Sequence, residues 1–306
     1  MKKNIIIIGS GNIAYRHLQS IIDNINIHKI YIYDINKLTY EKLYNLLNYS
    51  ENIKKLVFVY DLKKIKATTF YLALITSYAY KRFNVIDSIN KKFKIKFFLI
   101  EKVVENNTQN LMKLKKLKLN SYVNLHMRMM KPYKIIKNKL EKNCPIKCLV
   151  IGKKWNLASN SLHYINYVSY ISNSGVEKIL FKKISKPYET KRHNIIDFFG
   201  EIDVKYENGS SLKLKSITRK IKRKIQIKQN NNNYEYYIDD SILFLNNNKF
   251  QIKTENTSVL SGVFLNSLIN NKITLPTFNE HVYEHKLFLE SLLKALNKKK
   301  LIYSIT

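Results

Sequence analysis

The stretch that most restricts the fold of this chain lies at its start, where a short apolar run leads into a glycine-containing loop. Residues 4–8 are mostly isoleucine, and Gly9-Ser10-Gly11-Asn12-Ile13-Ala14 follows them and opens a helical pattern. In a G-x-G-x-x-A turn the first glycine permits tight turning. The second lets the backbone approach a pyrophosphate, and the small last residue lets helix and strand pack closely. We therefore predict a phosphate loop that faces the N-terminus of a helix.

A carboxylate stands at the end of the next predicted strand, residues 28–34. Asp34 follows Ala14 by 20 residues, a spacing at which a carboxylate can accept hydrogen bonds from both hydroxyls of a ribose. Because a carboxylate at this position repels a 2′-phosphate, we predict NAD as the cofactor in preference to NADP. The alternative interpretation is a simple glycine turn followed by an unrelated surface aspartate.

The first part of the chain alternates short apolar runs with helical spacing, which is typical of a doubly wound parallel sheet. We expect this α/β domain to span residues 1–120. The predicted strands are residues 4–8, 28–34, 55–60, 69–76 and 93–100, and the predicted helices are residues 13–25, 36–49, 62–65 and 78–90.

The second part has another rhythm and predicts an α+β domain with a mostly antiparallel open sheet, over residues 121–306. The pair Asn208-Gly209 supplies the positive φ angles of a two-residue hairpin turn. The predicted strands are residues 121–127, 147–151, 201–206, 211–228, 234–238 and 242–245, and the predicted helices are residues 132–140 and 279–296.

The charge of the chain is strongly positive, since 54 Lys and Arg stand against 22 Asp and Glu, for a net charge of +32. Lys, Asn, Ile and Tyr share AT-rich codons, so we attribute most of this excess to composition rather than to a nucleic-acid partner. The densest segment, residues 216–228, alternates Lys with Ile as a half-buried strand would. It is predicted to place Lys220, Lys222, Lys224 and Lys228 on one side and Ile217, Ile221, Ile225 and Ile227 on the other. Nucleic-acid binding through this segment remains a weaker hypothesis.

The small number of cysteines and the absence of a long apolar run argue against a disulfide-rich, a metal-binding or a membrane-spanning protein. Cys144 and Cys148 form neither a disulfide framework nor a four-ligand metal site. No apolar run approaches the roughly 18 residues of a membrane span, and the start does not read as a secretory signal. We expect two structural thiols, no metal, no membrane contact and a soluble cytoplasmic protein.

A family resemblance rests on the first loop, on Glu101-Lys102 after the fifth strand, on Asn124 and Arg128 after the sixth, and on residues 155–166. In these parts the sequence resembles the glucose-fructose oxidoreductase / inositol dehydrogenase / MocA (Gfo/Idh/MocA) family. The resemblance covers almost the whole chain. It implies a Rossmann domain that binds NAD(P), a C-terminal domain for substrate binding and oligomerisation, and a sugar, polyol or sugar-nucleotide substrate. It also implies a homodimer or homotetramer. The segment 155–166 is similar to a branch associated with bacterial surface-glycan biosynthesis.

The resemblance also assigns roles to particular residues. Lys102 and His163 are the implied catalytic residues, because hydride removal from an alcohol requires a group that takes the hydroxyl proton. A lysine at the carboxyl edge of a parallel sheet, partly desolvated beside a nicotinamide, is expected to have a lowered pKa. Besides the first loop and Asp34, the cofactor-binding residues would be Thr76, Ser77, Tyr78 and Glu101. The substrate-binding residues would be Asn124, Arg128, Trp155, Asn160 and Asn166.

The chain departs from the family pattern near its implied catalytic residues. Ser159 and Asn166 stand where family members commonly have acidic residues, four before and three after the histidine, and Val103 replaces a proline after Glu-Lys. No carboxylate is then evident to orient the imidazole, although Asn160 or Asn166 could form a hydrogen bond with it. These departures keep a second hypothesis open, a catalytically weak dinucleotide-binding protein that acts as a sensor or as the partner of another enzyme.

Overall fold

The computed structural model describes residues 2–190, 195–298 and 305. The chain divides into two compact units. The first contains residues 2–105, 109–124 and 256–280, and the second contains residues 106–108, 125–255 and the described residues from 281 onward.

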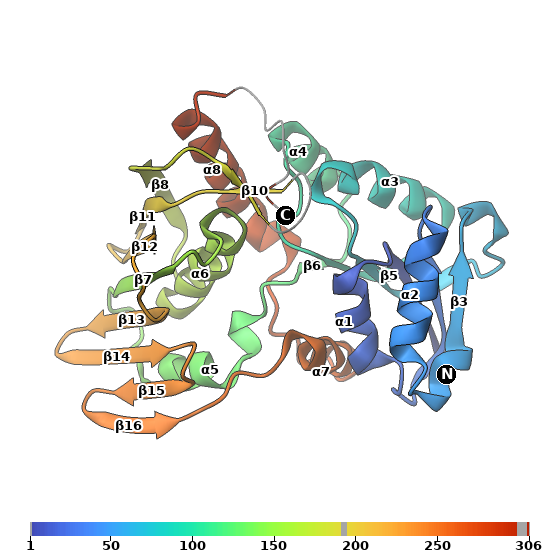
Figure 1. Cartoon of the computed structure of the whole chain (residues 1–306), viewed down its shortest axis with the longest axis horizontal. Helices are drawn as coiled ribbons and strands as arrows, with labels where there is room; N and C mark the ends of the chain where they lie inside the picture. Colours follow the sequence, from blue (N-terminus) through green and yellow to red (C-terminus); the bar gives the residue numbers. More distant parts are fainter. Residues whose placement is uncertain (1, 191–194, 299–304, 306) are drawn as a thin grey trace. The chain divides into compact units, whose positions relative to one another are not determined.

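The first unit is built on a six-stranded parallel sheet with the strand order β3-β2-β1-β4-β5-β6. Figure 1 labels β3, β5 and β6 among these strands. All its strand pairs are parallel, and the isoleucines of the central strand are buried. The predicted doubly wound fold is therefore confirmed. The strands are β1 (Lys3–Ile8), β2 (Ile27–Tyr33), β3 (Leu56–Val59), β4 (Thr69–Ile75), β5 (Lys94–Ile100) and β6 (Ser121–Val123).

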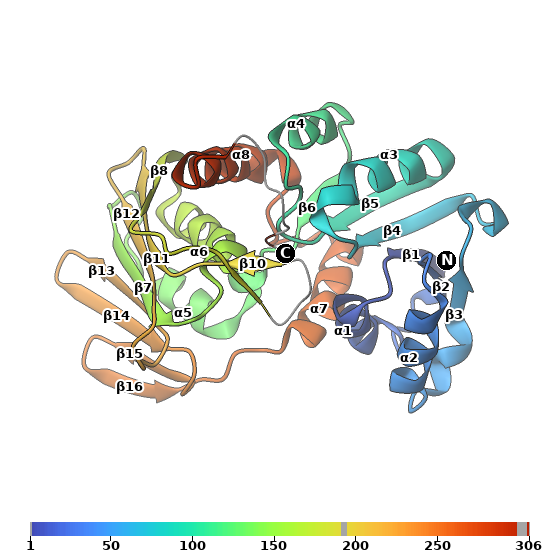
Figure 2. The ribbon, with the colours of Figure 1, turned by 45° about the horizontal axis from the view of Figure 1, so that its top comes forward.

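Helices cover both faces of this sheet; Figure 2 shows α3 on one side and α1, α2 and α7 on the other. The α-helices are α1 (Asn12–Ile21), α2 (Lys37–Leu47), α3 (Arg82–Lys92), α4 (Thr108–Lys116) and α7 (Thr257–Ile269). Short 3₁₀ helices are η1 (Glu51–Lys55), η2 (Leu62–Lys64) and η3 (Ala79–Lys81).

The first unit extends beyond the boundary predicted at residue 120. The strand expected over residues 121–127 ends at Val123 and gives way to a 3₁₀ helix, η4 (His126–Met129). Helix α7, which the sequence pattern does not reveal, packs against α1. A Cβ atom at Gly262 would lie 2.7 Å from the carbonyl oxygen of Ser20, so the absence of a side chain there permits the close approach of α7 to α1.

The second unit is built on an eight-stranded mixed sheet with the strand order β16-β15-β14-β13-β7-β12-β11-β8. Strand β7 pairs in parallel with β12, and every other pair is antiparallel. This agrees with the predicted mostly antiparallel sheet. The strands are β7 (Lys147–Lys153), β8 (Val176–Lys182), β11 (Gly200–Tyr206), β12 (Ser211–Ile217), β13 (Lys224–Gln229), β14 (Asn232–Tyr237), β15 (Ile242–Leu245) and β16 (Asn248–Gln251).

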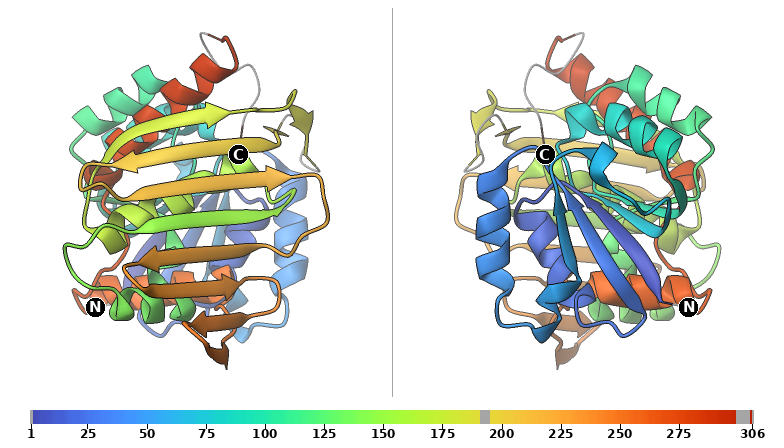
Figure 3. Two further views of the ribbon diagram at one scale, coloured as in Figure 1. Left: turned by 90° about the vertical axis from the view of Figure 1, so that its left-hand side faces the viewer. Right: turned by 90° about the vertical axis from the view of Figure 1, so that its right-hand side faces the viewer.

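Helix α6 (Leu157–Ser172) packs on one face of this sheet, and the left view of Figure 3 looks onto the strands from the other face. Helices α5 (Lys131–Lys139) and α8 (Phe278–Ala295) and a small pair of strands, β9 (Tyr188–Glu189) and β10 (Ile196–Asp197), complete the described elements. Ion pairs lie along the outer face, such as Lys182 with Asp203 at 2.6 Å and Lys215 with Glu201 at 3.1 Å.

The basic segment predicted as one strand is interrupted. β12 ends at Ile217 and β13 begins at Lys224, so residues 218–223 form no strand. The predicted alternation holds in β13, where Ile225 and Ile227 are buried, but it is wrong before it, since Ile221 is 38% exposed. A hairpin at Asn208-Gly209 is confirmed between β11 and β12, but the predicted two-residue turn is wrong. Gly209 has a positive φ of +83° and Asn208 does not, and the Tyr206 nitrogen donates to the Ser210 carbonyl across a longer loop.

Both cysteines are free thiols. Cys148 is buried on β7, and this burial raises the pKa of its thiol. In the parts of the chain that the structure describes, no helix combines the length and the apolar character needed to cross a bilayer.

Candidate functional site

The predicted phosphate loop leaves β1 at a residue that only glycine suits. Gly9 has φ +98°, and a Cβ atom there would lie 3.1 Å from the backbone nitrogen of Ser77. Gly11 precedes α1, and a Cβ atom there would meet no atom within 4 Å. Ala14 is buried, in agreement with close packing of the helix on the sheet. The loop therefore offers open space in front of Gly11 and the N-terminus of α1, an arrangement that suits an anion.

The carboxylate of Asp34 is held next to this loop. Its Oδ2 accepts hydrogen bonds from the Ser10 backbone nitrogen at 2.8 Å and from Ser10 Oγ at 2.7 Å, and its Oδ1 accepts from the Asn36 nitrogen at 3.1 Å. The main chain is fixed as well, because the Tyr40 hydroxyl accepts from the Asp34 nitrogen at 2.7 Å and bonds the carbonyls of Asp34 and Val59. Asp34 is thus oriented before any ligand binds. Ser10 of the loop connects to Asp34 through these two hydrogen bonds, although the residues are 24 positions apart in the sequence.

The residues after β4 have separate roles. Thr76 Oγ1 lies 2.9 Å from the carbonyl oxygen of Ile8 and 3.1 Å from that of Gly9, so it supports the phosphate loop from behind. The Ser77 carbonyl accepts from Arg82 Nε at 2.8 Å. Tyr78 is 58% exposed. Of these three predicted cofactor residues, Thr76 acts on the loop itself and Tyr78 presents its ring to the surroundings.

Glu101, at the end of β5, is the centre of a polar network in the first unit. Its Oε1 accepts from His17 Nε2 at 3.1 Å and from the Asn124 amide, while His17 Nδ1 lies 2.6 Å from Ser261 Oγ. Burial opposes ionisation of Glu101, but the hydrogen bonds and charge of His17, the Asn124 amide and the charge of Arg82 outweigh it and lower its pKa to about 2. The predicted cofactor residue Glu101 and the predicted substrate residue Asn124 therefore contact each other.

Lys102 lies one residue beyond this network, at the carboxyl edge of the parallel sheet and half-buried. The peptide bond between Lys102 and Val103 is cis. The buried guanidinium of Arg82 donates to the carbonyls of Glu101 and Val103 and so holds the loop on both sides of Lys102. The sequence did not reveal this role of Arg82, since nothing in a helical arginine indicates an inward direction.

In the second unit, one face of α6 gathers several predicted site residues. The His163 ring lies 4.6 Å from the ring of His126 between centroids, and Asn166 Oδ1 accepts from Arg128 Nε at 2.9 Å. The guanidinium carbon of Arg128 lies 4.4 Å from the centroid of the Tyr170 ring. The structure therefore brings His163, Asn166 and Arg128 together, and it adds His126 and Tyr170.

A carboxylate from α8 lies behind Asn166. Glu284 is 7% exposed, and it accepts from Asn166 Nδ2 at 3.1 Å, from Ser169 Oγ and from His281 Nδ1, which lies at 2.9 Å. Burial raises the pKa of its carboxyl, but His281 and the two other donors outweigh burial and hold the pKa below its usual value. Glu284 is separated from Asn166 by 118 residues, so no local pattern could have indicated it.

Trp155 and Asn160 contact each other at the start of α6. Trp155 is 4% exposed and its Nε1 donates to the Lys215 carbonyl at 2.8 Å, while Asn160 Nδ2 donates to the Trp155 carbonyl at 2.9 Å. Stacking of Trp155 on a sugar does not agree with this placement, because packing already covers its ring. Asp197 caps the helix, since its Oδ1 accepts from the Ala158 nitrogen at 2.9 Å.

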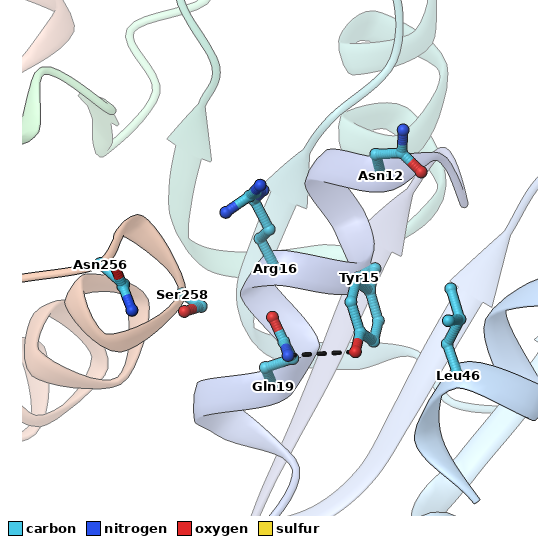
Figure 4. Close-up of a pocket in the computed structure, with 7 residues that line it drawn as sticks. All are labelled: Asn12, Tyr15, Arg16, Gln19, Leu46, Asn256 and Ser258. Carbon is cyan, nitrogen blue, oxygen red and sulfur yellow. Dashed lines mark hydrogen bonds between the residues drawn. The ribbon is translucent and has the colours of Figure 1, made fainter.

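A polar pocket lies along α1 in the first unit (Figure 4). Arg16 and Gln19 extend from α1, and Gln19 Nε2 donates to the Tyr15 hydroxyl at 3.1 Å. Asn12, predicted to bind the cofactor, lines this pocket at the beginning of the helix. The lining residues are Asn12, Tyr15, Arg16, Gln19, Leu46, Asn256 and Ser258.

No protein-family model and no curated protein sequence matches the chain. Solved structures match it over nearly their whole length. Scyllo-inositol dehydrogenase from Lactobacillus casei, with NAD(H) and scyllo-inositol bound, is 13% identical, with 97% of this chain and 98% of that chain covered and a TM-score of 0.69. UDP-N-acetylglucosamine 3-dehydrogenase from Acidithiobacillus ferrooxidans is 10% identical, with 96% of each chain covered and a TM-score of 0.70. The transcriptional regulator Gal80p from Kluyveromyces lactis is 16% identical, with 98% and 91% covered and a TM-score of 0.72.

These similarities lie at low identity and concern the fold. They include enzymes and a regulator, so they do not by themselves assign an activity. Together with the sheet order of the two units, they confirm the predicted architecture. The chain has the fold of the Gfo/Idh/MocA-type oxidoreductases, a Rossmann sheet combined with a mixed, mostly antiparallel sheet.

Proposed function

We propose that this protein is an NAD-dependent oxidoreductase that transfers hydride between nicotinamide and a hydroxyl or carbonyl group of a sugar, polyol or sugar nucleotide. The observation that carries the proposal is the Asp34 carboxylate, held by both hydrogen-bond donors of Ser10 beside the open backbone at Gly11. A carboxylate placed there accepts ribose hydroxyls, and the loop receives the pyrophosphate. We infer NAD rather than NADP, because the same negative charge repels a 2′-phosphate.

Hydride transfer also requires a proton to leave or join the reacting oxygen. A bound nicotinamide would supply the hydride acceptor or donor. We assign the proton exchange to Lys102, at the carboxyl edge of the six-stranded sheet, and to His163, on the polar face of α6. Ligands bind at that edge in open parallel sheets, and imidazole exchanges protons near neutral pH. Glu101 holds the main chain next to Lys102 through its network with His17 and Asn124.

The relatives support a sugar-like substrate and keep the second hypothesis open. One of the similar structures binds scyllo-inositol and another is named for a UDP-sugar, whereas Gal80p is a transcriptional regulator. Ser159 takes the place of an acidic residue before His163, which favours the alternative of a catalytically weak dinucleotide-binding protein. Turnover separates the two, since the alternative binds NADH without hydride exchange on any sugar.

The test begins with titrations of the protein with NADH and NADPH, followed by nicotinamide fluorescence at moderate salt. We expect tighter binding of NADH, and a narrower preference in Asp34→Asn. Asp87→Asn on α3 removes the same charge from the same unit and should preserve the preference. A preference for NADH over NADPH that is as large in Asp34→Asn as in the unaltered protein would contradict the assignment of Asp34.

A substrate screen then tests the chemistry. Lys102→Ala and His163→Ala are each expected to abolish turnover on any sugar that the unaltered protein oxidises, while NADH still binds. Unchanged turnover in either variant would remove that residue from the reaction. No turnover by the unaltered protein, with NADH bound, would favour the sensor hypothesis.

A further inference from the structure

Two cations meet on one aromatic ring in the second unit. The guanidinium carbon of Arg128, on η4, lies 4.4 Å from the centroid of the Tyr170 ring, and Nζ of Lys137, on α5, lies 3.4 Å from it. Two positive charges repel each other, and an aromatic face offsets only part of that repulsion. Among the described residues, Lys137 forms no ion pair with a carboxylate. The Lys137 ammonium, next to a second cation, therefore favours an anion as a further partner.

Arg128 is oriented by a buried chain of hydrogen bonds. Its Nε donates to Asn166 Oδ1 at 2.9 Å, and Asn166 Nδ2 donates to Glu284 Oε2 at 3.1 Å. Asn166 is 1% exposed, and Glu284 is held in turn by Ser169 and His281. Because the carboxylate accepts only, the amide of Asn166 must turn its oxygen toward Arg128. A guanidinium fixed through Nε has a defined plane, which is the geometry of bidentate phosphate recognition.

The ring lies on the same face of α6 as the proposed catalytic histidine. His163, Asn166 and Tyr170 follow one another at i, i+3 and i+7, so they form one stripe along the helix. Seven residues of helix separate His163 from Tyr170 by about 10 Å along the axis. A reacting hydroxyl near His163 would thus be separated from an anion at Tyr170 by a distance that one sugar ring and a phosphate linkage can span.

We propose that the substrate carries a phosphate group on its sugar, and that Arg128 and Lys137 bind this phosphate beside Tyr170, with Glu284 and Asn166 positioning Arg128. The inference rests on the proposed function for the reaction at His163. It narrows the substrate class to sugar phosphates and nucleoside-diphosphate sugars.

Binding of three probes by calorimetry, at moderate salt and with NADH present, tests the proposal. The probes are uridine diphosphate, inorganic pyrophosphate and a sugar 1-phosphate. We expect at least one of them to bind, and Arg128→Gln to weaken that binding about tenfold or more, the loss typical of a charge-assisted hydrogen bond. Lys137→Gln should weaken it about threefold or more. Lys134→Gln, an exposed change of the same charge on α5, should alter it less than twofold.

The positioning role of Glu284 has its own test. Glu284→Gln should weaken probe binding severalfold, because the amide of the new glutamine can donate to Asn166. The side-chain oxygen of Asn166 would then turn toward the glutamine and away from Arg128. In the double variant that combines Arg128→Gln with Glu284→Gln, the loss of probe affinity should equal that of Arg128→Gln alone, as expected for coupled residues. Glu290→Gln, an exposed carboxylate of the same helix, is the control. A loss that simply adds in the double variant would show a structural effect and overturn the positioning role.

The outcomes distinguish a nucleotide sugar from a sugar phosphate as the source of the phosphate. They also distinguish failure of the phosphate site from failure of the proposed function. Tighter binding of uridine diphosphate than of the sugar phosphate supports a nucleotide sugar, and the reverse supports a sugar phosphate. No binding of any probe, or equal losses in Lys134→Gln and Lys137→Gln, would overturn the phosphate site. The NADH affinity, measured in the same samples, should stay unchanged in all these variants. Failure of NADH binding would instead contradict the proposed function.

Discussion

Glu101→Gln should remove a pH-dependent part of the stability of the first unit. The Glu101 carboxyl has a pKa of about 2, against an ordinary value of 4.5, because His17, Asn124 and Arg82 together outweigh the effect of its burial. A difference of this size corresponds to about 3 kcal/mol in favour of the folded state when the carboxyl is ionised. Since the pKa is depressed by folding, this contribution is present above about pH 4.5 and is lost as the pH falls toward 2.

The measurable part lies between pH 6 and pH 3. Over that range linkage gives a loss of about 2 kcal/mol from this carboxyl alone, which is about a thirtyfold change in an opening equilibrium. Glu101→Gln cannot show this loss, so its stability should fall less steeply with acid. Glu41→Gln, an exposed carboxylate on α2, should follow the unaltered protein.

The assay must report on the first unit. Trp155 is the only tryptophan and lies in the second unit, so its fluorescence is not a suitable probe. Hydrogen exchange of peptides from β1, β4 and β5, corrected for the intrinsic effect of pH, measures the opening of the correct sheet. Parallel pH dependence in Glu101→Gln and in the unaltered protein would refute the argument that this carboxylate is ionised and stabilised by its partners.

Three further changes test the framework of the sites. Gly9→Ala would place a Cβ atom 3.1 Å from the Ser77 nitrogen at a φ of +98°, so we expect a loss of about 1 kcal/mol or more in thermal unfolding and weaker NADH binding. Tyr40→Phe removes the hydroxyl that fixes the main chain at Asp34 and should cost about 1–3 kcal/mol, measured by urea unfolding of the first unit. Asp197→Ala removes the cap of α6 and should cost about 1–2 kcal/mol, seen as an earlier transition of Trp155 fluorescence.

The first unit could largely be predicted because its signals are local. The isoleucine run, the glycines of the loop and Asp34 each have a physical role that neighbouring residues reveal, and the strand bounds agree within one or two residues over the first five strands. Helix α7 escaped prediction for a physical reason. More than 130 residues separate it in the sequence from the rest of the first unit, which ends at Asn124 before the chain returns with α7. In addition, its apolar residues are spread around the whole helix rather than along one face.

The interrupted basic segment shows where periodicity misleads. Ile217, Ile221 and Ile225 keep the spacing of one face of a continuous strand, yet the chain leaves the sheet after Ile217 and returns at Lys224. A pattern of period two states which side chains could share a face, but only pairing with a neighbouring strand decides whether a strand exists. Here β12 and β13 both pair with β7, from opposite sides, so the connecting residues must cross over its end.

The same distinction governs the carboxylate near the proposed catalytic histidine. The sequence around His163 holds Ser159 and Asn166, and from that stretch alone the helix has no acidic residue to orient its polar face. The fold supplies Glu284 from α8, and its bond to Asn166 continues to Arg128. Hydrogen bonds from Asn166, Ser169 and His281 outweigh burial and hold the pKa of this carboxyl below its usual value. The acceptor that begins the chain of contacts to Arg128 thus lies on a helix 118 residues away from Asn166 along the chain, where no pattern around His163 could indicate it.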